Sequence, residues 1–280
     1  MTGKLIVCPT PIGNMEDMTE RGKRVLAEAD LIAAEDTRHT LGLLNHLGIK
    51  TPMISCHQHN EQERTEQILE KLREGKTVAL VSDAGTPAIS DPGEILVRRC
   101  CEEGIPVTAL PGACAFVTAL SMSGMPSRRF VFEGFLPAGG KERRARLEAL
   151  RTEERTVIFY EAPHHLRQTL SDFLEAFGDR KLAMGRELTK RHEEMLRMRL
   201  SEAIAYYQEQ DPRGEYVLIL EGADSLVRER EERARWEQMT LTEHMALYSE
   251  LPQKEAMKQV AKDRGISKRD VYQGLLQEES

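Results

Sequence analysis

The sequence predicts an α/β fold made of two α/β domains, followed by a small helical region. In the first 120 residues, strand-like apolar runs alternate with helical patterns, and a second α/β series follows the turn residues SGMPS. Alternation of this kind is typical of βαβ units and a mainly parallel sheet. After residue 223 the composition changes to a charged stretch and two short helical patterns. We therefore expect three parts, at residues 1–123, 124–223 and 224–280.

The first part is expected to contain five strands and four helices. The strands lie in KLIVCPT, DLIAAED, PMISCH, TVALVSD and PVTALPG, and the helices lie near residues 19–29, 40–47, 61–74 and 93–103. Each of these strands ends in polar, Gly or Pro residues. Because ligands of open parallel sheets bind at the carboxyl ends of the strands, we expect the chemistry to gather at this edge.

The second part is expected to be a smaller α/β domain with a helical tail behind it. Its strands lie in FVFEGFLP, RTVIFYEAP, KLAMGREL and EYVLILEG, and its helices at about 141–151, 164–177 and 201–209. The charged stretch 224–237 is typical of a solvated connecting helix, supported by (i, i+4) pairs such as Glu229 with Arg233. The tail predicts a helix over 253–264, a turn at Gly265, an N-cap at Ser267 and a second helix from Lys268, which resembles a helix-turn-helix unit.

Composition narrows the class of protein. A chain of 280 residues with 40% hydrophobic and 30% charged content can bury a real core. No apolar run approaches the roughly 20 residues that cross a bilayer, and the N-terminus shows no signal-peptide pattern, so we expect a cytoplasmic protein without a membrane partner. The five cysteines lack metal-ligand spacing, which favours reduced structural thiols and no metal.

Charge is distributed unevenly along the chain. The net charge of -7 argues against a surface that is basic throughout. Two local clusters are basic, however: GGKERRAR, and residues 254–269, where six basic side chains face two acidic ones. Local clusters of this kind are what nucleic-acid binding requires.

The common nucleotide-binding motifs are missing. No G-x-G-x-x-G follows the first strand, and GLLNHLGIKT does not have the spacing of a phosphate-binding P-loop. This argues against a Rossmann dehydrogenase and against a P-loop enzyme.

Three loops rich in Pro and Gly follow strands of the first domain. They are PTPIGN, SDAGTPAISDPG and LPGACA. Proline fixes backbone angles and glycine allows close approach, so each loop by itself is also consistent with a rigid turn. Three such loops on one sheet edge favour a bound small molecule instead.

Charged residues at three further strand ends leave two interpretations open. In AAEDTRHT, Asp36 or Thr37 can cap a helix beside an ion pair within the loop. Alternatively, Arg38 can hold an RNA phosphate while Glu35 or Asp36 orients a ribose hydroxyl. In GRELTK, Glu187 can form an ion pair or position substrate. The stretch CHQHNE, with His57, His59, Asn60 and Glu61, offers no convincing third metal ligand, and structural or RNA-contacting roles suit it better.

Nine motifs in a fixed order carry a family resemblance. They are PTPIGN, AEDTRHT, HNE, VSDAGTPAISDPG, LPG, EGFLP, FYEAPHH, RELTK and GEYVLILEG. In this order the chain resembles the ribosomal small subunit methyltransferase I family, which is similar to the tetrapyrrole methylases. The resemblance implies a two-domain α/β fold that binds S-adenosyl-L-methionine in a cleft between its domains. It also implies a homodimer, and 2′-O-methylation of a decoding-centre cytidine in 16S rRNA of the 30S ribosomal subunit. Ala113 and His165 depart from the family pattern.

With this resemblance, roles can be assigned to residues. Those expected to bind the cofactor are Pro11, Gly13, Ser82, Asp83, Ala84, Gly85, Thr86, Pro87, Ile89, Pro111, Gly112, Tyr160 and Ala162. Those expected to bind RNA are Arg38, His57, Asn60, Arg143, Arg144, Lys190, Lys258, Lys262, Lys268 and Arg269. The hypothesis for the general base is Glu35 or Asp36, with Glu187 second, and Arg38 completes the catalytic set.

Three other functions stay open from the sequence. A tetrapyrrole methyltransferase shares the fold, although such enzymes resemble GGDP where this chain has AGTP. A diphthine synthase-like enzyme would methylate a protein. A ribosome-assembly protein without catalytic activity would bind RNA and only sense the cofactor.

Overall fold

The computed structural model describes residues 3–58, 60–224, 236 and 238–278. These residues pack as two compact units, which are described separately. The first holds the described residues up to Glu148 together with Arg155–Glu221, and the second holds Ala149–Glu154 and the described residues from Gly222 onward. His59 and nearly all of the predicted connecting helix 224–237, with its pair Glu229 and Arg233, lie outside the described residues. The three-part division at residues 123 and 223 stays a prediction.

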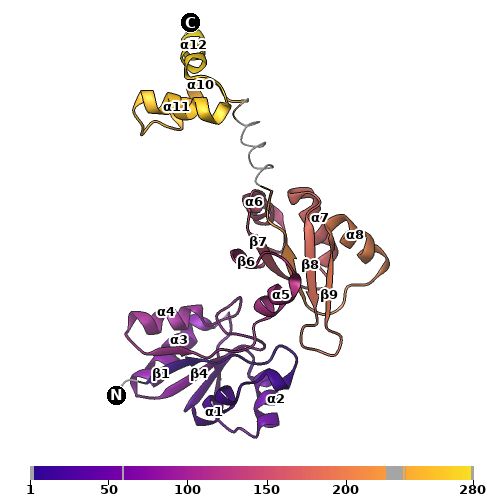
Figure 1. Cartoon of the computed structure of the whole chain (residues 1–280). Coiled ribbons are helices and arrows are strands. Elements are labelled where there is room, and N and C mark those ends of the chain that lie inside the picture. Colours follow the sequence, from indigo (N-terminus) through magenta and orange to yellow (C-terminus); the bar gives the residue numbers. More distant parts are fainter. Residues whose placement is uncertain (1–2, 59, 225–235, 237, 279–280) are drawn as a thin grey trace. The chain divides into compact units, whose positions relative to one another are not determined.

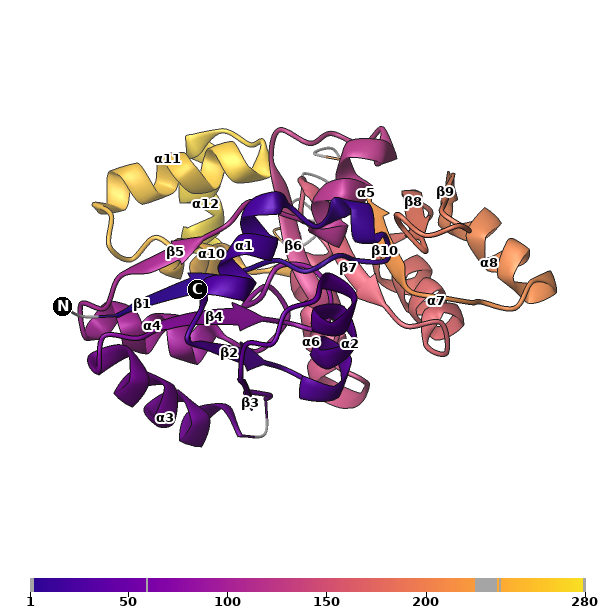
Figure 2. The same cartoon turned by 90° about the horizontal axis from the view of Figure 1, so that it is seen from below.

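The first unit begins with a parallel sheet of five strands. The strands are β1 (Lys4–Val7), β2 (Leu31–Ala34), β3 (Met53–Ser55), β4 (Thr77–Val81) and β5 (Val107–Ala109), in the order β3-β2-β4-β1-β5. Every pairing in this sheet is parallel, as predicted. Figure 2 shows the strands in this order, from β3 at the bottom of the view to β5 at the top.

Helices cover both faces of this sheet (Figure 1). They are α1 (Glu20–Glu28), α2 (Thr37–Leu47), α3 (Glu61–Arg73) and α4 (Glu94–Glu102), with a short 3-10 helix η1 (Met15–Asp17) before α1. Alternate side chains of β1 explain the two layers: Leu5 and Val7 join the core under α3 and α4, whereas Ile6 and Cys8 join the core under α1 and α2. Helix α2 begins three residues before the predicted start near residue 40, because Asp36 caps it.

A second, mixed sheet completes the first unit. Its strands are β6 (Phe130–Phe135), β7 (Thr156–Glu161), β8 (Lys181–Arg186), β9 (Glu194–Arg199) and β10 (Tyr216–Leu220), in the order β6-β7-β10-β8-β9. Only the pairing of β6 with β7 is parallel. The sequence analysis missed β9, since this edge strand is half exposed and mixes Glu and Arg with Met.

The second sheet also has helices on both faces. They are α5 (Ala115–Ser123), α6 (Gly140–Leu150), α7 (Leu166–Phe177) and α8 (Leu200–Glu209). Although α5 follows the last strand of the first sheet, its Ala119 packs with Ile158 and Ile219 of the second sheet. On the opposite face, the rings of Phe159 and Phe173 lie 4.7 Å apart. Helix α5 was not predicted, because the run AFVTALSMS has no charged residue to mark an exposed face.

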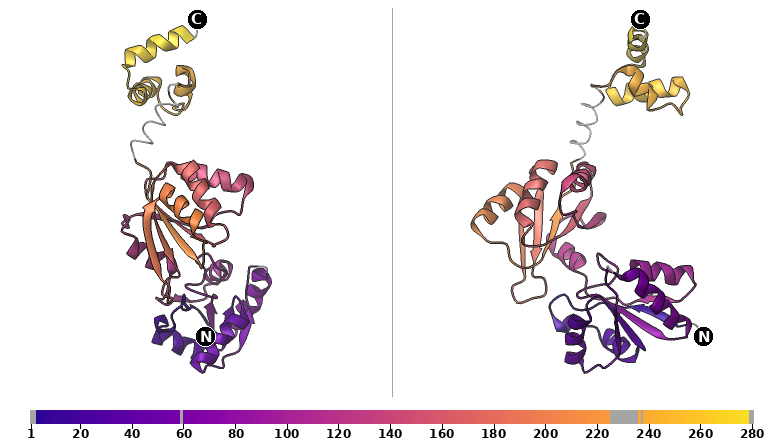
Figure 3. Two further views of the ribbon diagram at one scale, coloured as in Figure 1. Left: turned by 90° about the vertical axis from the view of Figure 1, so that its right-hand side faces the viewer. Right: turned by 180° about the vertical axis from the view of Figure 1, so that it is seen from behind.

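Within its described residues, the second unit contains three C-terminal helices, drawn in yellow in Figure 3. They are α10 (Leu241–Ala246), α11 (Gln253–Arg264) and α12 (Lys268–Glu278). The predicted helix 253–264 and the predicted start at Lys268 are confirmed, and the Ser267 hydroxyl accepts a hydrogen bond from the amide of Asp270. Helix α10 was not predicted. Among the described residues, no helix is both long and apolar enough to span a bilayer.

Candidate functional site

Hydrogen bonds join the three Pro- and Gly-rich loops into one surface. Thr10 and Gly85 exchange two backbone hydrogen bonds of 2.9 and 3.0 Å. The Thr10 hydroxyl also donates to the carbonyl of Ser82 at 3.1 Å. The Thr86 hydroxyl donates to the carbonyl of Ala113 at 2.9 Å. The loops after β1, β4 and β5 therefore hold one another in place at the carboxyl edge of the first sheet.

The loop after β4 adopts backbone angles that are uncommon for residues other than glycine. Ala88 and Ser90 have φ of 63° and 64°, although neither is a glycine. Gly93 has φ of 129°, and a Cβ there would lie 2.6 Å from Leu80 Cδ2. Such conformations persist only where the surrounding structure enforces them, and they cluster at binding sites.

Glu35 and Asp36 at the end of β2 take different roles. The amide of Asp83 donates to Glu35 Oε2 at 3.3 Å, and the Asp83 carboxylate accepts from the amide of Asp36 at 3.1 Å. Asp36 caps α2 by accepting from the amide of Arg38 at 2.8 Å, and it pairs with the Arg38 guanidinium at 2.7 Å. The hydrogen bond from that guanidinium holds the pKa of Asp36 well below its usual range. The structure thus contains both the helix cap at Asp36 and an ion pair within the loop, between Asp36 and Arg38.

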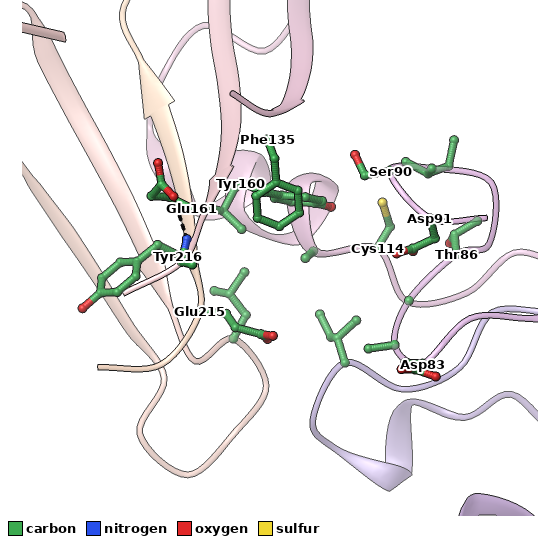
Figure 4. Close-up of a pocket in the computed structure, with 18 of the residues that line it drawn as sticks. Asp83, Thr86, Ser90, Asp91, Cys114, Phe135, Tyr160, Glu161, Glu215 and Tyr216 are labelled. Carbon is green, nitrogen blue, oxygen red and sulfur yellow. Dashed lines mark hydrogen bonds between the residues drawn. The ribbon is translucent and has the colours of Figure 1, made fainter. Parts of the chain in front are cut away.

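A cavity of about 310 Å³ lies in the first unit, between these loops and the second sheet. Figure 4 shows Asp83, Thr86 and Asp91 on one side of it and Tyr160 and Tyr216 on the other. Its volume is at the lower end of the range for small-molecule sites. The two sheets of the first unit therefore supply opposite walls of one site.

Glu187 and Lys190 belong to the wall from the second sheet. Glu187 has φ of 49°, and its Oε1 accepts from Lys190 Nζ at 3.0 Å and from the amide of Glu215 at 3.3 Å. The hydrogen bond from Lys190 lowers the pKa of Glu187. Lys190 also lies over Gly13, where a Cβ would come within 2.4 Å of Lys190 Cγ. The ion pair that the sequence left as one alternative is present, and both partners line the cavity.

Two half-buried carboxyl groups in the cavity have raised pKa values. Burial, followed by the charge of Glu35, raises the pKa of Asp91 to about 7. Burial also raises the pKa of Glu35. Tyr160 stays neutral, because burial raises the pKa of its hydroxyl. That hydroxyl accepts a hydrogen bond from the amide of Phe116 at 3.3 Å. Strongly perturbed groups in a cavity are typical of functional sites.

Comparison with known proteins identifies the family. A family model described as Tetrapyrrole (Corrin/Porphyrin) Methylases matches residues 4–204. Relatives named ribosomal RNA small subunit methyltransferase I are similar over almost the whole chain. The protein of Halalkalibacterium halodurans is 49% identical and covers 96% of this chain and 93% of its own length. That of Escherichia coli O157:H7 is 46% identical and covers 99% and 96%. This chain belongs to the ribosomal RNA small subunit methyltransferase I family.

Solved structures show how far the fold of this family is shared. Uroporphyrin-III C-methyl transferase from Thermus thermophilus, complexed with S-adenyl homocysteine, superposes with a TM-score of 0.57 at 18% identity, covering 78% of this chain and 97% of that one. Diphthine synthase superposes with a TM-score of 0.62 at 13% identity, covering 78% and 89%. At these identities the likeness concerns the fold alone.

In this member of the methyltransferase I family, only some of the predicted cofactor residues line the cavity. Those that do are Asp83, Ala84, Gly85, Thr86, Ile89, Tyr160 and Ala162. Those that lie in the same loops without lining it are Pro11, Gly13, Ser82, Pro87, Pro111 and Gly112. Gly112 has a packing role, since a Cβ there would lie 2.5 Å from Pro9 Cβ.

The predicted RNA-binding residues are spread more widely. Lys190 alone among them lines the cavity. Asn60 accepts from the amide of His57 at 2.8 Å and so shapes its own loop. Arg38, Arg144, Lys258, Lys262 and Arg269 are exposed, and Lys268 is half-buried.

Arg143, a predicted RNA-binding residue of the basic cluster GGKERRAR, is paired within the fold. Its side chain is only 11% exposed, and its guanidinium binds the Asp172 carboxylate at 2.6 Å and the Thr169 hydroxyl at 2.7 Å. This largely buried guanidinium holds α6 against α7, and its contact with an RNA phosphate stays an untested prediction. The sequence could not show this, because Arg143 and Arg144 look alike until the buried face of α6 is known.

Several residues of the cavity were not singled out from the sequence. They are Ile12, Ser90, Asp91, Cys114, Ala115, Phe135, Glu161, Leu188, Glu215, Tyr216 and Val217. All of them lie inside the Pro- and Gly-rich loops or the family motifs, so the signal was present. Across the described part of the chain, no three His, Cys, Asp or Glu side chains are grouped to hold a metal ion.

Proposed function

We propose that this chain transfers a methyl group from S-adenosyl-L-methionine to the 2′-hydroxyl of a decoding-centre cytidine in 16S rRNA of the small ribosomal subunit. Membership of the methyltransferase I family supports methylation of small-subunit rRNA. The observation that carries the proposal is the cavity at the carboxyl edge of the first sheet, whose loops are bonded together around it.

The residues of the cavity fit this cofactor. Ile12, Leu188 and Val217 offer apolar contact for an adenine ring, and carboxylates offer partners for hydroxyl groups and for positive charge. Gly85 has φ of 81°, and a Cβ there would lie 3.4 Å from Ile12 Cγ2, so its missing side chain leaves room for close approach. The backbone from Asp83 to Thr86, with Tyr160 and Ala162 opposite, would hold the cofactor.

The bound cofactor supplies a methyl group that is already activated by its positive sulfur. The protein must therefore chiefly align two reactants, and alignment can contribute about 7–11 kcal/mol. A positioned base adds about 10² to 10⁴-fold. This balance agrees with a site whose walls are rigid loops bonded to one another.

Glu35 suits the role of general base better than the other two candidates. Its pKa is raised by burial, whereas the pKa values of Asp36 and Glu187 are lowered by their cationic partners. Glu35 Oε2 accepts from the amide of Asp83. We assign Oε1 the task of taking the proton from the ribose hydroxyl.

RNA would be held outside the cavity by exposed basic side chains. Arg38, with 90% of its side chain exposed, and Arg144 serve this role in the first unit. In the second unit we assign phosphate contacts to Lys258, Lys262, Lys268 and Arg269. The homodimer and the cytoplasmic location remain predictions. Deleting the residues after 237 is expected to weaken RNA binding and reduce its dependence on salt, while cofactor affinity is kept. An unchanged salt slope would contradict the role of the tail.

Two measurements test the function. Titration calorimetry is expected to show binding of S-adenosyl-L-methionine to the purified chain. Mass mapping of 16S rRNA from a strain that lacks the gene is expected to show the loss of one ribose methyl group, which the intact gene restores. Cofactor binding without any change in 16S rRNA would favour a different methyl acceptor or a non-catalytic role.

A further inference from the structure

The cavity of the first unit is strongly acidic. Among its described lining residues, six carry carboxylates and one carries a cationic side chain, Lys190. The six are Glu35, Asp83, Asp91, Glu161, Glu187 and Glu215. A cavity lined by one sign of charge attracts ligands of the opposite sign and repels phosphates.

The three carboxylates from the second sheet already have partners. Glu187 pairs with Lys190 at 3.0 Å, and Glu215 lies 3.7 Å from the same ammonium group. Glu161 accepts from the amide of Ala162 at 2.8 Å and from the hydroxyl of Thr169. These groups need no charge from a ligand.

The three carboxylates from the first sheet differ in this respect. Glu35, Asp83 and Asp91 form no ion pair within 4 Å with any residue that the structure describes. Glu35 and Asp83 are bonded through the Asp83 amide. His57 acts electrostatically on Glu35 and Arg38 acts on Asp83, but the Arg38 guanidinium is already bound to Asp36.

Crowding of these carboxylates makes their negative charge costly without a cation. Burial is the largest cause of the raised pKa of Asp91, and the charges of Glu35 and Asp83 add to it, while the Ser82 side chain opposes it. The other titratable groups that face Asp91 are Cys114 and Tyr160, which are neutral. A positive charge placed among these carboxylates would relieve their repulsion, whereas a neutral ligand would not.

We propose that Glu35, Asp83 and Asp91 make the cavity select the cationic methyl donor over its uncharged thioether product, and so favour product release. This inference rests on the proposed function. In the transfer, the hydroxyl oxygen forms a bond to the methyl carbon while the carbon–sulfur bond breaks. The electron pair of the broken carbon–sulfur bond stays on sulfur, which becomes neutral. The proton of the hydroxyl group passes to Glu35 and from there to solvent. The cavity thus loses one positive charge at the moment when the product must depart.

The test is calorimetry on the full chain with three ligands. They are S-adenosylmethionine, S-adenosylhomocysteine, and sinefungin, which carries an amine in place of the sulfonium. At pH 8, both cationic ligands are expected to bind about tenfold tighter than S-adenosylhomocysteine, the equivalent of about one pKa unit. Because cation binding requires ionised Asp91, this preference should shrink as the pH falls from 8 to 6.

Variants separate charge from shape. Asp91→Asn keeps the size of the side chain and is expected to reduce the preference to about threefold or less and to flatten its pH dependence. The matched control is Asp211→Asn, which makes the same charge change at a side chain that is 77% exposed and outside the cavity. That control should keep the wild-type preference. Since the preference is a ratio within one preparation, an unfolded fraction does not affect it.

The possible outcomes lead to distinct conclusions. Equal affinity for S-adenosylmethionine and S-adenosylhomocysteine at pH 8 would overturn the inference and leave the proposed function intact. The same conclusion follows if Asp91→Asn lowers the affinity for all three ligands by the same factor. Failure of all three ligands to bind would overturn the proposed function itself, and this inference with it.

Discussion

The backbone amide of Asp83 donates a hydrogen bond to Glu35 Oε2 over 3.3 Å, between the ends of the neighbouring strands β4 and β2. In return, the Asp83 carboxylate accepts from the amide of Asp36. The two bonds hold Glu35 in the wall of the cavity, while Asp36 remains bound to Arg38 as the cap of α2. Adjacent carboxylates of one loop therefore have different surroundings and different chemistry.

Glu35→Gln is expected to slow methyl transfer by about 10² to 10⁴-fold, because the amide cannot take a proton. Glutamine still accepts the hydrogen bond from Asp83, so the loop keeps its shape. The rate is measured in single turnovers with 30S subunits at saturating cofactor. Asp36→Asn is the matched control, since asparagine also caps helices, and it should change the rate by less than about tenfold. A Glu35→Gln rate near that of the wild type would rule out this base.

Gly214→Ala is expected to destabilise the first unit by about 1–3 kcal/mol. Gly214 has φ of 76°, and an added Cβ would lie 2.4 Å from Glu187 Oε1. Denaturant unfolding measures the loss. Gly42→Ala serves as control, because Gly42 lies within α2 with open space around it, and alanine there should add up to about 1 kcal/mol of stability. Equal effects of the two substitutions would contradict the strain expected from the positive φ of Gly214 and from the contact with Glu187.

Arg143→Ala is expected to cost about 3 kcal/mol of stability, since it leaves the Asp172 carboxylate largely buried without its partner. Arg144→Ala, on the exposed side of the same helix, should change stability by less than about 0.5 kcal/mol. It should instead weaken RNA binding in a salt-dependent way. If Arg143→Ala unfolds like the wild type and loses RNA affinity, the structural role of Arg143 is wrong.

The stability of the second unit is expected to fall as the pH drops below about 6.5. His244 is buried, and Arg264 Nε donates to its Nδ1 at 3.0 Å, which requires the neutral ring. Burial, then Arg264, lowers the pKa of His244, although Asp263 opposes this. A base with a lowered folded pKa binds fewer protons folded than unfolded. Its contribution is therefore present above the unfolded pKa and lost as the pH falls through the window below it.

Trp236 offers a selective probe for that measurement. It is the only tryptophan of the chain, and its ring stacks on His244 at 4.2 Å. Its fluorescence should report unfolding of the second unit between pH 7.5 and about 5. His244→Gln should remove most of the pH dependence in this range. An unfolding midpoint that does not change with pH in the wild type would contradict the neutral state of His244.

Local patterns were sufficient for much of the fold. The alternation of strands and helices predicted the parallel sheet, and the cap residues predicted the start of α12 at Lys268. The same patterns failed for β9, whose edge position tolerates charge, and for α5, which carries no polar stripe. A pattern within one element reports its exposed face only when that face is polar.

The sequence by itself determined the family, the loops that would carry the site, and both possible roles of Asp36, since these depend on residues close together in the chain. Only the tertiary structure decided which of these residues face the cavity. It placed Asp91 beside Glu35, laid Lys190 over Gly13 and buried Arg143 against Asp172. Each of these relations joins segments far apart in the sequence, and their energies depend on burial and distance, which no local pattern encodes.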